Sequence, residues 1–477
     1  MQLKFLTQSL WHYRKSHLGV LAGTALGATV LLGALFAGDS VSGALKRLAS
    51  LRVGQAEYLL AAGDRFVRED LASDLASGLG VPAAPALMLR GSASRSDRDL
   101  LAPNVQALGV DARFWEFAPS PDEGPDFEMA NTVAVNQRLA DRLQLEVGDT
   151  FVLRIEKPGL LSRDAPLSGS KDNVIGIRVT VADIRSDDQY GRFSLQANQI
   201  SPFTIFAPIE WIQEQIERND RANLILLGSG ENFESVGDQQ LLSRVEPYLT
   251  LEDYGLSAVD VLLSQSTEIR SERVFIDEAI AAAIQASIPD TQPVITYLAN
   301  TLRVGGKDTP YSMVTAVSQS AAPFLGSGLQ SGEVAITSWL AEDLGAGVGD
   351  SLDLSYYIVD DASELVEEMT SYTIRAVLPH EGLVADRLWM PDFPGVADAE
   401  DSADWDAGIP LDLDRIREKD EEYWDDYKGA PKAFIALEAG EREWANRWGV
   451  YTALRVPAES LSKEELIATI LSQLDPL

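Results

Sequence analysis

Two stretches of this 477-residue chain, 201 positions apart, share one sequence pattern. Residues 133–155 read VAVNQRLADRLQLEVGDTFVLRI, residues 334–356 read VAITSWLAEDLGAGVGDSLDLSY, and 9 of the 23 aligned positions are identical. A single repeat at so long a period indicates two copies of a domain, because solenoid repeats recur every 20–50 residues or so. The repeat therefore predicts a duplicated fold.

The repeated stretch predicts a strand, a helix, a tight turn and a second strand. Its first apolar residues alternate, and Leu139, Ala140 and Leu143 then follow the spacing of a helix face. A Gly-Asp turn leads into a second alternating run. The framework residues of the two copies are Leu139, Gly148, Asp149, Leu340, Gly349 and Asp350. We interpret both aspartates as turn residues whose carboxylates accept hydrogen bonds from local backbone N–H groups, not as catalytic or metal-binding residues.

The correspondence extends to both sides of the repeat. AEYLLAAGDRFVREDLASDLA resembles VDVLLSQSTEIRSERVFIDEAIAAAI, and TIFAPIEWIQEQIERNDRANLILL resembles KAFIALEAGEREWANRWGVYTALRV. Each half also ends in a helical stretch, and in the second half Ser462 and Glu465 form a capping box. We therefore expect an α+β fold of two units, 53–250 and 256–477.

Residues 18–37 form an uncharged apolar run that is long enough to cross a membrane as a helix. A cleaved signal peptide, cut after Ala37, is the alternative, but this run is longer than a usual signal h-region. Helical spacing continues beyond it, where Val41, Leu45 and Leu48 share a face. We expect a transmembrane helix over 18–37 and a stalk helix over 38–52.

Charge sets the expected orientation and excludes one class of partner. The first 37 residues contain Lys4, Arg14 and Lys15 and no acid, so the net charge of −34 becomes −37 for the remainder. The positive-inside rule places residues 1–17 in the cytoplasm of a bacterium and the rest of the chain outside its inner membrane. A surface this acidic repels nucleic acid, which we exclude as a partner.

Three glycines give the membrane helix a face that can pack closely against another helix. Gly19, Gly23 and Gly27 recur every four residues, the spacing of small-residue packing motifs in membranes. No other stretch of the chain is able to span a membrane. Any partner helices must therefore come from a continuation of the chain or from a second chain.

Recognisable catalytic motifs are absent from the sequence. The chain has no cysteine and three histidines, of which only His380 lies in the acidic part. It has no P-loop, GxSxG, HExxH or dinucleotide-binding pattern. We predict no enzyme activity, no metal site and no cofactor in this chain, with an anchored hydrolase built around His380 as a minor alternative.

The second unit carries an acidic insertion over residues 391–427, with tryptophans at 405 and 424. We interpret it as a solvated loop held by aromatic anchors. A partner-binding segment and a calcium loop are the alternatives, although the ligand order of an EF-hand is missing.

Three stretches resemble one transporter family. They are SLWHYRKSHLGVLAGTALGATVLLGALFAGDSVSGALKRLA, VAVNQRLADRLQLEVGDTFVLRI and DRIREKDEEYWDDYKGAPKAFIAL. Together with the repeat they look like the N-terminal half of an ABC transporter permease of the macrolide-exporter (MacB-like) and FtsX-like superfamily, which includes lipoprotein-release permeases. The resemblance implies a transmembrane helix followed by a periplasmic core domain.

The same resemblance implies a function and partners. A separate cytoplasmic ABC ATPase binds ATP, membrane helices carry its motion to the periplasmic domain, and that domain exports or releases a substrate. Such permeases usually act as dimers and have at least three further membrane helices, so we expect the sequence to be a fragment of a longer permease. The alternative is a single-span, membrane-anchored binding or scaffold protein.

Overall fold

A computed structural model describes most of the chain. The described residues are 11–63, 65–121, 123–127, 131–157, 174–196, 200–230, 237–359, 365–393, 395–397, 399–402, 405 and 409–474. The expected cytoplasmic segment 1–17 and the insertion 391–427 lie partly outside these ranges, and the side chain of Leu48 lies outside them too.

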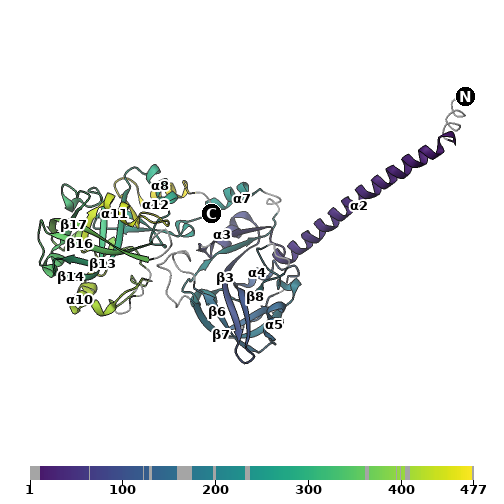
Figure 1. The fold of residues 1–477 in the computed structure, drawn as a ribbon, viewed down its shortest axis with the longest axis horizontal. Helices are drawn as coiled ribbons and strands as arrows, with labels where there is room; N and C mark the ends of the chain where they lie inside the picture. Colours follow the sequence, from purple (N-terminus) through teal and green to yellow (C-terminus); the bar gives the residue numbers. More distant parts are fainter. Residues whose placement is uncertain are drawn as a thin grey trace.

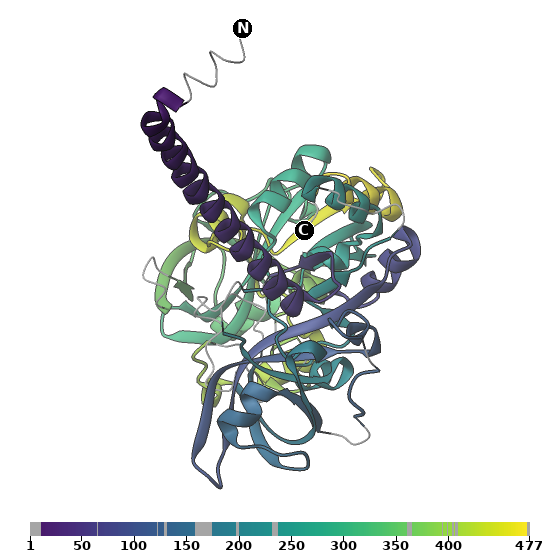
Figure 2. The ribbon, with the colours of Figure 1, turned by 90° about the vertical axis from the view of Figure 1, so that its right-hand side faces the viewer.

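The apolar run and the expected stalk form one continuous helix, α2 (Arg14–Val53), of 40 residues. At 1.5 Å per residue it is about 60 Å long. Figure 1 shows it leaving the folded part of the chain as an isolated rod, and in Figure 2, turned by 90°, the same helix projects toward the viewer in front of the lobes. Its segment Arg14–Arg47 is long and apolar enough to cross a membrane, and no residue of its most apolar window is buried.

The first lobe is built on an eight-stranded sheet in the order β1-β10-β3-β4-β8-β5-β7-β6. Its strands are β1 (Tyr58–Ala61), β3 (Ala83–Arg95), β4 (Leu100–Val110), β5 (Thr132–Asn136), β6 (Thr150–Glu156), β7 (Val174–Arg185), β8 (Phe203–Pro208) and β10 (Leu224–Leu227). Two short strands, β2 (Val67–Arg68) and β9 (Arg221–Ala222), form a separate pair. The helices are α3 (Leu71–Leu79), α4 (Ala112–Trp115), α5 (Gln137–Leu143), α6 (Ile209–Gln215) and α7 (Asp238–Val245).

The second lobe repeats this plan with nine strands in the order β11-β12-β19-β13-β14-β18-β15-β17-β16. They are β11 (Leu256–Val261), β12 (Ser266–Ser271), β13 (Gln292–Val304), β14 (Lys307–Val317), β15 (Glu333–Thr337), β16 (Ser351–Val359), β17 (Leu365–Leu378), β18 (Ala433–Ala436) and β19 (Ala453–Pro457). The helices are α8 (Glu278–Ser287), α9 (Ser338–Leu344), α10 (Glu418–Tyr427), α11 (Leu437–Trp444) and α12 (Lys463–Leu471).

Each lobe contains a closed barrel. In the first lobe β3 pairs with both β4 and β6, so the strands from β3 to β6 in the sheet order form a ring. In the second lobe β13 pairs with both β14 and β16 and closes the matching ring. Closure protects the strand edges that an open sheet would expose. The fold is therefore mixed α+β, with two similar sheet-based domains after one apolar helix, as the sequence predicts.

The sequence repeat maps onto the barrel cores. Leu139, Leu143 and Leu153 are fully buried in the first barrel. Their counterparts 201 positions later, Leu340, Leu344 and Leu354, are buried in the second barrel. The three leucines identical in both copies thus fill equivalent interiors, where a change of even one methylene group is felt, whereas the identical Val147 and Val348 are exposed.

A third core joins the two lobes. It combines residues of α3 and α7 from the first lobe with residues of α8 and α12 from the second, including Leu71, Val245, Ile284 and Leu466. Figure 1 shows these helices toward the middle of the molecule, where the lobes lie side by side. The lobes are therefore joined by packed apolar side chains as well as by the chain connection.

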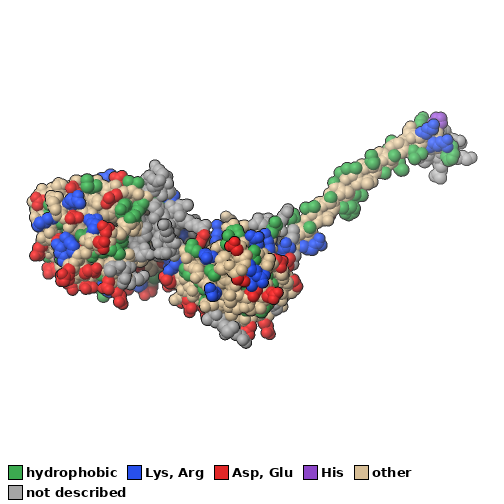
Figure 3. Space-filling view, turned by 60° about the horizontal axis from the view of Figure 1, so that its bottom comes forward, with side chains coloured by type: hydrophobic (Ala, Val, Ile, Leu, Met, Phe, Trp, Pro, Cys, Tyr) green, Lys and Arg blue, Asp and Glu red, His purple; other side chains and the backbone are tan. Residues whose placement is uncertain are grey.

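The acidic insertion differs from its expected form. Its last ten residues form helix α10. The acidic side chains in its first turn stabilise the helix by interacting with the positive end of the helix dipole. Asp420, Tyr423 and Trp424 of this helix are buried, so the solvated-loop interpretation is wrong for this part. The expected aromatic anchors do meet, with the rings of Trp405 and Trp424 4.8 Å apart. Figure 3 shows acidic side chains gathered along the lower edge of the second lobe.

Candidate functional site

The joint between α2 and the first lobe is the place where a membrane helix meets the folded domain. The helix ends at Val53, and Gly54 follows with φ of +59°, the left-handed conformation that commonly ends helices. A Cβ atom at Gly54 would lie 1.9 Å from the Phe117 carbonyl oxygen and 2.7 Å from the Tyr190 ring. Only glycine fits here, both for its backbone angle and for the close approach.

Hydrogen bonds fix the chain on both sides of Gly54. The Tyr190 hydroxyl donates to the Val53 carbonyl oxygen at 2.8 Å and so satisfies one of the helix's terminal acceptors. The Gln55 N–H donates to the Phe117 carbonyl oxygen at 2.8 Å. The helix end is therefore held to two separate segments of the first lobe.

An aromatic cluster supports this joint from inside the lobe. The rings of Phe114 and Tyr190 are 4.8 Å apart, and Phe193 lies 5.2 Å from each of them. The Arg185 guanidinium stacks over the neighbouring Trp115 ring at 4.7 Å. Burial raises the pKa of Tyr190 well above its usual range, so the hydroxyl stays protonated and remains a donor. These contacts make the joint closely packed.

Sequence reasoning did not single out the joint. A glycine directly after a helical run is a known end signal, and it was present at Gly54. The partners Phe117 and Tyr190 lie 63 and 136 positions further along, and no local pattern connects them to the helix.

Charged residues of the first lobe pair with acids of the second lobe and of the segment that joins the lobes. Arg68 of β2 donates through Nη2 and through Nε to one carboxylate oxygen of the fully buried Asp253, at 3.0 and 3.1 Å. Arg221 of β9 donates to Glu272 of the second lobe at 2.8 Å. Leu251 and Tyr254, the neighbours of Asp253 in the segment between the lobes, belong to the shared apolar core, so the ion pairs lie beside that core.

The predicted framework residues occupy matching turns in the two lobes. Gly148 and Gly349 have φ of +93° and +96°. The Asp149 carboxylate accepts from the Glu146 N–H at 2.9 Å, and the Asp350 carboxylate accepts from the Gly347 N–H at 2.8 Å. The hydrogen bond from the Glu146 N–H holds the pKa of Asp149 below its usual range, and Arg95 contributes further.

The predicted packing face of α2 is exposed. A Cβ added at Gly19, Gly23 or Gly27 would meet nothing within 4 Å. The structure thus places the three glycines away from all other described residues, and their role in helix packing stays a prediction.

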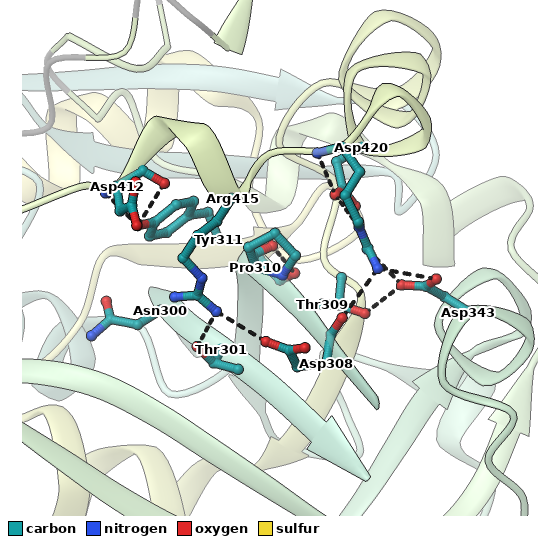
Figure 4. A network of polar contacts seen from close by, with 12 residues as sticks. Asn300, Thr301, Asp308, Thr309, Pro310, Tyr311, Asp343, Asp412, Arg415 and Asp420 are labelled. Atoms are coloured by element: carbon teal, nitrogen blue, oxygen red, sulfur yellow. Dashed lines mark hydrogen bonds and ion pairs between the residues drawn. The ribbon is translucent and has the colours of Figure 1, made fainter. Parts of the chain in front are cut away.

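The insertion docks onto the second barrel through a network of charges (Figure 4). Arg417 donates to Asp343 of α9 at 2.7 Å and to Asp420 at 2.6 Å. Arg415 donates to Thr301 of β13 at 2.9 Å and to Asp308 at 3.1 Å. The arginines therefore fasten the insertion to the barrel.

Lys432 lies buried beneath α10. Its Nζ atom sits over the rings of Trp339 and Tyr423, at 4.2 and 4.5 Å from their centres, and 3.8 Å from Asp420. Burial lowers its pKa to about 7, against the opposing attraction of Asp420. Among the described residues, no group of three His, Asp or Glu side chains is arranged to hold a metal ion.

His380 lies against the same helix. Its ring is 5.3 Å from the ring of Tyr423 and 4.3 Å from that of Tyr427. Burial, reinforced by the charge of Lys432, lowers its pKa to about 4. The imidazole is therefore neutral at physiological pH.

Comparisons with known proteins concern the fold alone. No family model matches the chain, and no curated protein matches its sequence. Among solved structures, the periplasmic region of MacB from Actinobacillus actinomycetemcomitans matches at a TM-score of 0.27 and 8% identity, over 41% of this chain and 83% of that one.

Two further solved structures match to a similar extent. The extracellular domain of the noncanonic ABC-type transporter YknZ from Gram-positive bacteria matches at a TM-score of 0.24 and 10% identity, over 39% of this chain and 86% of that one. A domain of a permease protein from Porphyromonas gingivalis matches at a TM-score of 0.24 and 14% identity, over 39% of this chain and 73% of that one.

Proposed function

We propose that this chain is the permease-side component of an ABC transporter, in which α2 carries ATP-driven motion from the membrane to an extracytoplasmic domain that exports or releases a substrate. The observation that carries the proposal is the joint at Gly54. A helix that only anchored a domain would need no fixed angle at its end. Here the angle is set by a steric fit to Phe117 and Tyr190 and by hydrogen bonds on both sides.

The proposal assigns the orientation from the sequence. Residues 1–17 lie in the cytoplasm of a bacterial inner membrane, and the two lobes lie outside it. Basic residues also lie on the domain side of the helix, at Lys46, Arg47 and Arg52, and labelling of intact cells tests the orientation. Because the sequence contains no P-loop, ATP is bound by a separate ATPase subunit.

Motion that reaches the first lobe would also reach the second. The lobes share an apolar core, and Arg221 of the first lobe donates a hydrogen bond to Glu272 of the second lobe. Tilting α2 would therefore move the two-lobed domain instead of bending a loose hinge. Gly19, Gly23 and Gly27 are proposed to pack against further permease helices, in this chain's continuation or in a second chain of a dimer.

The experiment uses the full chain purified from its native membrane in mild detergent. We expect a P-loop ATPase subunit to co-purify in a fixed ratio. A fluorophore on Gln330→Cys, at an exposed position of the second lobe, should change its emission when ATP and vanadate are added. Because the chain has no native cysteine, the label reports one site.

Two glycine variants supply the test of coupling. Gly63→Ala also places alanine at a positive φ, +66°, but meets nothing within 4 Å, so it should respond as the parent does. Gly54→Ala should keep the ATPase bound and lose the response. Absence of any ATPase subunit, or an equal response from both variants, would contradict the proposal.

A further inference from the structure

A cleft of about 130 Å³ lies where the two lobes meet. The first lobe contributes Arg65 and Phe66, which precede β2, and Arg218, which follows α6. The second lobe contributes residues from three segments, 254–256, 271–280 and 447–448. The cleft is therefore built jointly by segments far apart in the sequence.

Positive charge is concentrated in this cleft although the chain as a whole carries −34. Its walls include four arginines, Arg65, Arg218, Arg273 and Arg447, and two acids. Both acids have structural partners. Glu272 accepts from Arg221 at 2.8 Å, and Asp277 accepts from the Ala279 N–H as the N-cap of α8.

The setting of Arg218 favours an anion beside it. Burial lowers the pKa of Arg218; the carboxylates of Glu272 and Glu217 oppose this shift and the charge of Arg221 adds to it, and burial outweighs the two carboxylates. The charged guanidinium is thus less well stabilised here than in water. An added negative charge would restore that stabilisation.

Aromatic and aliphatic residues form the rest of the wall. Phe66, Tyr254, Phe275 and Trp448 line the cleft, and the Arg447 guanidinium lies over the Trp448 ring at 4.5 Å. The volume approaches the roughly 150 Å³ of a cavity that accepts one benzene molecule. The walls therefore suit a ring-sized apolar group next to a negative charge.

The backbone around the cleft is held in unusual geometry. Val274 is buried and has φ of +67°, a strained conformation for a β-branched residue. A Cβ at Gly449 would lie 2.0 Å from the Ile276 carbonyl oxygen, so the segment carrying Trp448 is packed tightly against the segment carrying Phe275. Such strain persists only where the surroundings enforce it, and it is common at ligand sites.

We infer that this interlobe cleft binds a small organic carboxylate, or the carboxylate end of a larger amphiphile, with the arginines holding the acid group and the aromatic wall holding the apolar part. Guanidinium groups bind carboxylates through paired hydrogen bonds. Because the two lobes each supply arginines, binding stabilises their present arrangement. The inference does not depend on the proposed transport function, since binding is measured on this chain alone.

The experiment is isothermal titration calorimetry on the full chain in detergent at low salt. Three probes of one size carry different charges: benzoate is negative, benzamide neutral and benzamidine positive. We expect saturable binding of benzoate at concentrations below about 10 mM, and none of benzamide or benzamidine. Decanoate binding more tightly than benzoate would identify a longer amphiphile as the ligand class, and the reverse order would identify a small free acid.

Variants locate the site. Arg447→Gln, at an exposed position on the rim, should weaken benzoate binding about tenfold or more, because a hydrogen bond to a charged group is lost. Arg303→Gln removes the same charge from an exposed position on β13 and should leave binding unchanged. Trp448→Leu should also weaken benzoate binding, because it removes an aromatic ring from the wall of the cleft.

Three outcomes would overturn the inference. They are no saturable benzoate binding at about 10 mM, benzamidine binding as tightly as benzoate, or equal benzoate affinity in the Arg447→Gln and Arg303→Gln proteins.

Discussion

Replacing Gly54 by alanine should loosen the joint between α2 and the first lobe. The added Cβ would lie 1.9 Å from the Phe117 carbonyl oxygen, whereas real Cβ atoms stay at 3.0 Å or beyond, so one segment must move by over 1 Å. That movement breaks the Gln55–Phe117 hydrogen bond, which contributes about 1 kcal/mol. Forcing a group into packed surroundings costs about 1–3 kcal/mol more.

The matched control is Gly63→Ala. Both glycines have a positive φ, +59° and +66°, so alanine has the same backbone cost of about 1 kcal/mol at either position. Of these two glycines, only Gly54 has other atoms within 4 Å of an added Cβ. The destabilisation of the joint by Gly54→Ala should therefore exceed the destabilisation by Gly63→Ala by about 2–4 kcal/mol, which is the sum of the clash and the lost hydrogen bond.

Native-state hydrogen exchange measures this difference locally, which suits a chain of two lobes and a membrane helix. The Gln55 amide should exchange about 30 to 1,000 times faster in Gly54→Ala than in Gly63→Ala. Equal exchange rates in the two variants would refute the steric argument.

Three further predictions concern the lobes and the membrane. Arg68→Met leaves the buried Asp253 carboxylate without its arginine and should lower the free energy of unfolding by about 3 kcal/mol, measured by urea denaturation, whereas Arg98→Met, at an exposed pair, should change it by under about 1 kcal/mol. The pKa of His380 is about 4 in the folded chain against 6.5 unfolded, so the unfolded state gains the proton first and stability should fall between pH 6.5 and 4, by at most about 3 kcal/mol. His380→Phe should lack this component, and a parallel pH profile for the variant and the parent would contradict it. In intact cells a membrane-impermeant maleimide should label Gln330→Cys and not His12→Cys, and the opposite labelling would reverse the proposed orientation.

Local patterns in the sequence predict much of the fold. Leu139 and Leu340 fall on helix faces, and alternating residues around Phe151 and Leu352 form strands, because these periodicities reflect burial on one side. The continuous helix over the apolar run follows for the same reason. Closure of each barrel by β3–β6 and β13–β16 is a long-range pairing, and no short window of sequence contains it.

The functional regions are less visible in the sequence for the same physical reason. Gly54 gave a helix-end signal, but its fit depends on Phe117 and Tyr190 from distant segments. The arginine-lined cleft assembles residues from both lobes. Helix α10 was not predicted because its many acidic residues resemble a solvated loop. Its residues Tyr423 and Trp424 are buried, and Trp424 packs against residues of the barrel that lie far away in the sequence.

The proposed coupling requires that α2 and the first lobe move as one rigid body. The most direct measurement is the distance distribution between spin labels at Asp39→Cys on α2 and Glu214→Cys on α6, both at exposed positions, in the full chain in a lipid nanodisc. A rigid joint predicts one narrow distribution that persists in Gly63→Ala, broadens in Gly54→Ala and broadens to a smaller degree in Tyr190→Phe. A broad distribution in the parent chain, or one that Gly54→Ala leaves unchanged, would contradict it.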